Sequence, residues 1–311
     1  MRARRLIALA ALVLVIVTLA TVTGGVLGGD ALAYTARGTL YAHDVRTGVD
    51  IRITGTLAAE ARYPQAAPNA DGLLYTVGFG LARWSFHEGP LLVRDLSDSR
   101  PAAFDGIRWS YDGTAALWLS HGEGRRGRAS LTRIDLATGA ATVTQLPLVQ
   151  IAPRILVPLD ERRLLLHGQA PFDSQFYYYI YDSTTGGFSR YDTLTEDVCR
   201  TVTAYDVAAS VDGTRLAVSC WPTSALFIAD VVTGTGREVP IYDVGAVATG
   251  VYRAAVRWSH DGAQLLVTTR ENGIGNAVVR VEVVDVTTGT SQQVLGGRDV
   301  RDVAWLGALR R

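Results

Sequence analysis

Aspartate residues recur at regular places in this sequence, and a row of carboxylates could bind a divalent metal ion or perform acid–base chemistry. Some lie in Ser-x-Asp-Gly motifs, as in SYDG at 110–113, and others in Asp-x-x-Thr-Gly motifs, as in DLATG at 135–139. A tight turn needs one such carboxylate per repeat, because Asp hydrogen-bonds its own backbone and Gly adopts positive φ. A single active site needs no copy in every repeat. We therefore interpret ten residues as structural turn residues: Asp112, Gly113, Asp135, Asp182, Asp212, Gly213, Asp230, Asp261, Gly262 and Asp285.

Short apolar runs rich in β-forming residues surround these turns. The runs after Ser-x-Asp-Gly include AALWLS, RLAVSC and QLLVTT, and those before Asp-x-x-Thr-Gly include SLTRID, ALFIAD and VRVEVVD. With one strand before the first motif and one after the second, each repeat has four strands, and no segment after residue 33 has helical periodicity. Repeats follow one another at roughly 40 to 55 residues, the period of a propeller blade. The third repeat departs most, because PLDERR at 158–163 replaces its first motif.

The number of repeats predicts six blades. Full units begin near residues 63, 107, 152, 203 and 254, and the segment from Gly38 supplies a third and a fourth strand. The C-terminal RDVAWLGALRR resembles a first strand, because Trp305 falls where Trp109 and Trp258 fall. We interpret these three tryptophans as core residues between blades. The sequence thus predicts an all-β fold over residues 34–311: a six-bladed β-propeller of four-stranded blades, its ring closed by both termini.

The two motifs together resemble the WD-like repeats of TolB-like six-bladed propellers. The resemblance covers about residues 34–311, but the Pro that usually follows the Ser is replaced by Tyr111, Val211 and His260. It implies a propeller fold and, for relatives, roles as partner-binding platforms or as gating domains on peptidases. No hydrolase domain follows in this sequence, so the resemblance favours the binding role.

Residues 1–33 form a separate N-terminal segment. Arg2, Arg4 and Arg5 precede an uncharged run from Leu6 to Gly29, which as a hydrophobic helix of roughly 36 Å could cross a bilayer. Positive charge before the run predicts a cytoplasmic N-terminus. The sequence ALA at 31–33 also offers a signal-peptidase site before Tyr34. A membrane anchor and a cleaved signal peptide both remain open, and both place the propeller outside the cytoplasm, at the bacterial cell membrane or secreted.

Cysteine usage agrees with that compartment, and the net charge bears on the choice of partner. Cys199 and Cys220 lie a short distance apart with no metal-binding spacing, and we predict that they form a disulfide. Apolar residues make up 48% of the chain, and the formal net charge is zero, which gives no global field to attract nucleic acid. Membrane contact is expected through the N-terminal segment only.

Alternating strand directions give the propeller two faces. We define the turn face as the face that carries two kinds of connection in each blade: the one between the first and second strands and the one between the third and fourth strands. The loop face carries the remaining connections, which vary more in length and therefore favour function. On the loop face we predict a partner-binding surface for a protein or cell-envelope component, made of two groups: Trp84, Phe86, His87 and Glu88; and Arg125, Arg126 and Arg128.

An enzyme is the alternative. No zinc-protease, nucleophile-elbow or phosphate-loop motif is present, and no cofactor is predicted. A lactonase-like, metal-dependent hydrolase could still hold its metal in the central channel. Spacing cannot show whether the acidic and amide side chains of the loops converge there: Glu60, Glu123, Glu196, Asp197, Glu271 and Asn272. We therefore expect an extracytoplasmic binding scaffold without catalysis, with the channel hydrolase as the alternative.

Overall fold

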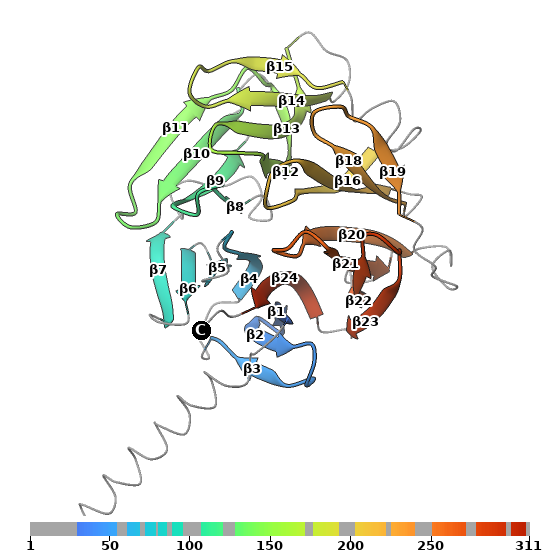
Figure 1. Cartoon of the computed structure of the whole chain (residues 1–311). Coiled ribbons are helices and arrows are strands. Elements are labelled where there is room, and N and C mark those ends of the chain that lie inside the picture. Colours follow the sequence, from blue (N-terminus) through green and yellow to red (C-terminus); the bar gives the residue numbers. More distant parts are fainter. Residues whose placement is uncertain are drawn as a thin grey trace, which may run out of the picture.

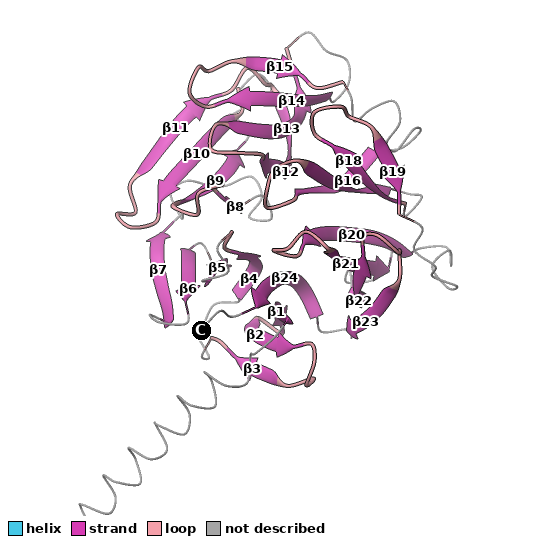
Figure 2. Cartoon of the chain, viewed as in Figure 1, coloured by secondary structure: helices cyan, strands magenta, loops and turns pink. Residues whose placement is uncertain are grey.

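The chain forms six four-stranded antiparallel sheets arranged radially around a central axis (Figures 1 and 2). The computed structural model describes residues 30–54, 61–68, 72–78, 80–85, 89–95, 107–120, 128–171, 177–192, 203–221, 225–239, 251–271, 278–296 and 300–308. Within these residues, no helix is long and apolar enough to cross a membrane.

Each sheet is one blade, and its first strand lies innermost (Figure 1). Blade 1 contains β4 (Ala61–Ala66), β5 (Gly72–Val77), β6 (Gly80–Ser85) and β7 (Gly89–Asp95). Blade 2 contains β8 (Arg108–Trp109), β9 (Ala115–Ser120), β10 (Ser130–Asp135) and β11 (Ala141–Gln145), and blade 3 contains β12 (Gln150–Pro158), β13 (Arg163–Gln169), β14 (Tyr177–Asp182) and β15 (Phe188–Arg190). Blade 4 contains β16 (Thr203–Ala209), β17 (Arg215–Trp221), β18 (Leu226–Asp230) and β19 (Gly236–Glu238), and blade 5 contains β20 (Val251–Trp258), β21 (Gln264–Glu271), β22 (Val278–Asp285) and β23 (Ser291–Leu295).

The sixth blade combines strands from distant parts of the sequence. Its order is β24 (Val300–Ala308), β1 (Asp30–Ala36), β2 (Thr39–Asp44) and β3 (Asp50–Arg52). Strand β1 begins at Asp30, four residues before the predicted start of the propeller domain at residue 34, and Ala31–Ala33 are fully buried between β2 and β24. Small apolar residues suit a signal-peptidase site and a buried strand equally, so the sequence did not separate the two.

The core lies between neighbouring blades. Val157 and Leu165 of blade 3 pack in one cluster with Val207 and Leu216 of blade 4. Strand β9 is buried on both faces along almost its whole length, which explains its continuous apolar run. The outermost strands β11 and β19 are largely exposed.

The repeated motifs form the connections of the turn face. In blade 5, Ser259 Oγ donates to Asp261 Oδ1 (2.6 Å) and accepts from Gln264 N (2.9 Å). At the other turn of that blade, Asp285 Oδ1 accepts from the backbone N–H groups of Thr287 (2.9 Å) and Thr288 (2.7 Å). Equivalent bonds are made in other blades by Asp44, Asp112, Asp135, Asp182, Asp212 and Asp230. These carboxylates are thus occupied by their own turns.

Candidate functional site

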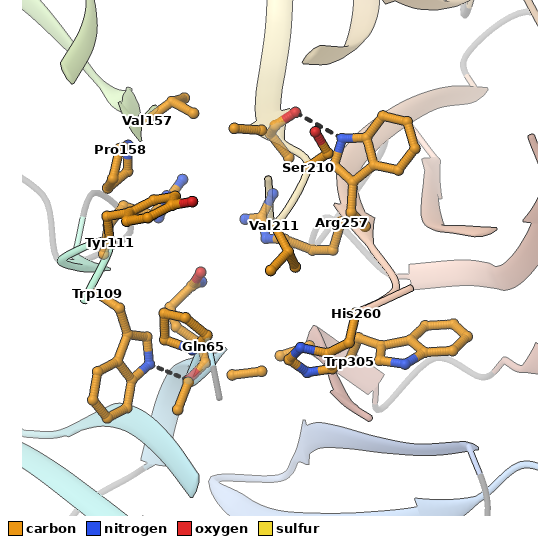
Figure 3. A pocket seen from close by; sticks show the side chains of 18 of the residues that line it. Gln65, Trp109, Tyr111, Val157, Pro158, Ser210, Val211, Arg257, His260 and Trp305 are labelled. Atoms are coloured by element: carbon orange, nitrogen blue, oxygen red, sulfur yellow. Dashed lines mark hydrogen bonds between the residues drawn. The ribbon is translucent and has the colours of Figure 1, made fainter. Parts of the chain in front are cut away.

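A cavity of about 300 Å³ occupies the turn-face mouth of the central channel. All six innermost strands contribute to its wall, which also includes Ser110. Tyr111, Val211 and His260 of the first turns stand at its rim (Figure 3). This volume lies at the small end of the range for ligand pockets. No lining residue in the described part of the chain is acidic, whereas Arg108 and Arg257 are both present.

An ion pair at the channel wall sets the position of Arg257. Asp206 of β16 is almost completely buried, and its Oδ2 accepts from Arg257 Nη1 (2.5 Å) and from the backbone N–H of Val256 (3.1 Å). Arg108 Nη2 stands 3.9 Å from Asp206 Oδ1. One carboxylate therefore lies between two guanidinium groups from different blades.

The guanidinium of Arg257 uses only one of its edges. Both of its hydrogen bonds to described residues come from Nη1, to Asp206 and to the carbonyl of Val256. Its Nε is buried without a hydrogen-bond partner. Figure 3 shows the side chain extending from β20 into the cavity, and a fifth of it is exposed. The edge formed by Nε and Nη2, which has the shape that pairs with a planar anion in two parallel hydrogen bonds, makes no hydrogen bond to a described residue.

The tryptophans around the cavity tie neighbouring blades together. Trp109 Nε1 donates to the carbonyl of Gln65 (2.9 Å), and Trp258 Nε1 donates to the carbonyl of Ala208 (3.0 Å) (Figure 3). Each bond joins an innermost strand to that of the preceding blade. Trp258 and Trp305 are buried, whereas Trp109 is half-buried. Because these rings are fixed by packing and bonds, the wall of the cavity is rigid as well as apolar.

The histidine at the rim is neutral at physiological pH. Burial lowers the pKa of His260, and a hydrogen bond with the backbone of Pro68 opposes that shift. At neutral pH the cavity therefore owes its positive charge to its arginines.

A second cavity adjoins the first. It has a volume of about 340 Å³ and lies between blades 2 and 3, and Ser110 and Tyr111 line both cavities. Its wall is more polar, with Asp112, Arg133 and Glu161 among its residues. The two cavities are therefore neighbours on either side of Ser110 and Tyr111.

The structure corrects the expected position of one predicted partner-binding residue. Trp84 lies in strand β6, paired with Leu73 and Pro90, and packs against the core cluster of blades 1 and 6. It is therefore not part of a loop between strands two and three. The glycines and Arg83 gave this segment the composition of a loop, although Leu81 and Ala82 of β6 are buried. Phe86, His87 and Glu88 lie outside the described residues, between β6 and β7.

The other predicted residues are only partly described. Arg128 is exposed immediately before β10, as a loop-face residue would be, while Arg125 and Arg126 lie outside the described residues. Cys220 is buried at the end of β17 and is not a free thiol. Cys199 also lies outside the described residues, so the disulfide stays a prediction. Within the described part of the chain, no three acidic, His or Cys side chains are grouped so as to hold a metal ion.

Sequence reasoning missed the residues that distinguish this cavity: Arg108, Asp206 and Arg257. A signal was present, because IRWS and VRWS place an arginine inside an otherwise apolar innermost strand. A charge in such a position requires a buried partner or a ligand. The partner, Asp206, comes from another blade and could not be identified from spacing.

Comparison with known proteins identifies the fold. No protein-family model matches the chain, and no curated protein matches it. Among solved structures, TolB from Acinetobacter baumannii superposes with a TM-score of 0.63 at 16% identity, covering 90% of this chain and 67% of that one. A putative TolB from Agrobacterium tumefaciens gives 0.57 at 15% identity, covering 89% and 98%. A chain of a nidogen–laminin complex gives 0.61 at 10% identity, covering 90% and 99%. At these identities the likeness establishes the fold alone.

Proposed function

We propose that this TolB-like six-bladed propeller is a binding module, without catalytic activity, that takes a protein or cell-envelope ligand at the turn-face mouth of its channel. The observation that carries the proposal is the cavity of about 300 Å³ to which every innermost strand contributes. Its rigid apolar wall and its few polar groups, among them Arg257, are the features of a ligand site. The propeller chain solved in the nidogen–laminin complex is a further reason to favour protein binding.

This proposal moves the binding site from the loop face to the turn face. The loop face keeps Arg128 as its one described partner-binding residue, and an exposed arginine there is typical of any soluble surface. The turn face offers a cavity and a buried charge cluster. We therefore treat the loop face as the competing site in the experiment below.

We also propose that the module works outside the cytoplasm, because it follows the uncharged, apolar run from Leu6 to Gly29 in the sequence. Cleavage after Ala33 would remove half of β1, including the residues that pair with Ala42, His43 and Asp44 of β2. Signal cleavage at that position would therefore open the sixth blade. We expect the mass of the mature protein to show that Asp30–Ala33 is retained.

Photo-crosslinking in intact cells tests the location of the site. We would place a benzophenone amino acid at Val211, which lines the cavity and is 43% exposed, or at Val232, which is 84% exposed on another turn of the same blade. We expect an adduct of discrete mass from Val211 and none from Val232. Filling the cavity by Ala209→Trp should abolish that adduct, because Ala209 lines the same wall.

Three outcomes would contradict the proposal. Equal adducts from both valines would show nonspecific contact with the turn face. An adduct only from a benzophenone at Arg128 would return the site to the loop face. A stoichiometric divalent ion in native mass spectra of the purified protein would instead support the channel hydrolase.

A further inference from the structure

We propose that Arg257 anchors the free C-terminal carboxylate of an extended peptide segment inside the channel cavity. This inference rests on the proposed function, because it names the ligand chemistry of the same site. It depends on the hydrogen bonds that Arg257 makes and on what surrounds its remaining edge.

The geometry of Arg257 selects a carboxylate. Asp206 and the carbonyl of Val256 both accept from Nη1 and hold the guanidinium in place. Nε is left buried without an acceptor, and the side chain lines the cavity. A buried donor without a partner is costly, and two parallel bonds from the Nε–Nη2 edge to one carboxylate would satisfy it. A neutral amide presents only one acceptor oxygen to this edge and would satisfy it less well.

The size and wall of the cavity select what is attached to that carboxylate. A volume of about 300 Å³ corresponds to roughly ten water volumes, which accommodates the last residue of a peptide rather than a folded element. Trp109, Trp258 and Trp305 line it together with alanines of other innermost strands. An apolar or aromatic final side chain would bury its surface against these rings.

The second cavity gives the rest of the peptide a path. It shares Ser110 and Tyr111 with the channel mouth and lies between blades 2 and 3. Its wall carries hydroxyl and charged side chains, including Thr142, Thr144 and Arg133, that can bond a peptide backbone. A free small acid would leave this path empty, so the two cavities together favour a peptide over a small molecule.

Two matched probes test the inference on the full-length protein in detergent solution. The first is a fluorescein-labelled pentapeptide, Gly-Ser-Gly-Ala-Phe, with a free carboxyl terminus, and the second is the same peptide with a C-terminal amide. Fluorescence anisotropy gives both dissociation constants. We expect the free acid to bind about tenfold or more tighter than the amide, since charge-assisted hydrogen bonds are the strong ones.

Two arginine variants assign the effect to Arg257. Arg257→Lys keeps a positive charge beside Asp206 but loses the two parallel N–H donors of the guanidinium, and we expect it to remove the preference for the free acid. The control is Arg237→Lys on the outermost strand β19, where Arg237 donates to the carbonyl of Val286, far from the channel strands. The control should keep the preference. Unchanged melting temperatures would show that both variants are folded.

The outcomes separate this inference from the proposed function. If acid and amide bind equally and Ala209→Trp blocks both, the cavity binds peptides but the carboxylate anchor is wrong. If phenylacetate binds at Arg257 while neither peptide does, the peptide source is wrong. If no probe binds and Ala209→Trp also leaves the cellular adduct of Val211 intact, the proposed function fails as well.

Discussion

The turns of this propeller repeat, whereas the strands that line its channel do not. At the turn face, Asp135, Asp230 and Asp285 accept nearly the same backbone bonds in three different blades. Four residues before the Asp of the first turn, blade 2 has Arg108, blade 5 has Arg257 and blade 3 has Leu156. A feature present in every blade serves the fold, because every blade must meet the same local requirement. A feature present in one or two blades calls for an explanation specific to the site.

Replacing Asp206 should give the largest change in stability among the variants that test this contrast. Only 3% of Asp206 is exposed, and its carboxylate accepts hydrogen bonds from Arg257 and from the backbone N–H of Val256. Removing it therefore leaves the charge of Arg257 and the N–H of Val256 without their partner. We expect Asp206→Ala to lower the free energy of unfolding by about 3 kcal/mol, the usual cost of breaking a buried ion pair. Urea denaturation followed by tryptophan fluorescence measures it.

A repeated carboxylate is the control for Asp206. Asp261→Ala removes hydrogen bonds from Ser259 and from the backbone of Ala263 at an exposed turn. It should cost only about 1 kcal/mol. Equal losses for the two variants would mean that the channel ion pair is no more important to the fold than a turn, and the contrast would fail.

Sequence reasoning reached the repeated part of the molecule far better than the unrepeated part. The six blades follow from short-range rules, since Asp, Gly and alternating strands act within a few residues. Even Asp160 in the divergent PLDERR turn accepts from the backbone of Arg162 and Arg163, as its repeat position requires. The Asp206–Arg257 pair joins residues about fifty positions apart on different blades, which no local pattern encodes. Trp84 was misplaced because a half-buried strand with glycines has the composition of a loop.

Two turn glycines test whether equal motifs are equal in three dimensions. Gly113 and Gly213 both have φ near +70°, so alanine is strained at either position. A Cβ at Gly213 would also overlap the backbone carbonyl of Leu159 in the neighbouring blade, whereas at Gly113 the nearest atom is Cδ of Pro68 at 3.6 Å. We expect Gly113→Ala to cost about 1 kcal/mol and Gly213→Ala about 2 kcal/mol or more. Thermal melts of the two variants compare them, and a larger loss for Gly113→Ala would show that the turns of blades 3 and 4 do not pack as described.

The last comparison concerns acid, where the repeated and unrepeated groups titrate in different pH ranges. Burial lowers the pKa of His167 from its ordinary 6.5 to about 4, and its ring stacks on Tyr178 at 4.6 Å. Between these two pH values the unfolded chain therefore binds more protons at His167 than the native protein does. The contribution of the neutral His167 to the free energy of unfolding is fully present above pH 6.5 and is lost as the pH falls toward 4. The bond from Ser259 holds the pKa of Asp261 below its ordinary 3.8, so the stability it contributes is lost only below that pH.

Melting temperatures between pH 7 and pH 3 resolve these two ranges. His167→Phe preserves a ring against Tyr178 and should flatten the curve between pH 6.5 and 4 by a few degrees, without changing its acid limb. Asp261→Asn should change only the acid limb of the curve and leave the range between pH 6.5 and 4 unaltered. It leaves the imidazole of His167 in place and removes only a carboxylate that titrates below pH 4. A His167→Phe curve parallel to that of the unaltered protein would show that the imidazole is protonated as readily in the native state as in the unfolded one. The fall above pH 4 would then have to come from another group, with His260 at the channel rim the next to test, since burial also lowers its pKa.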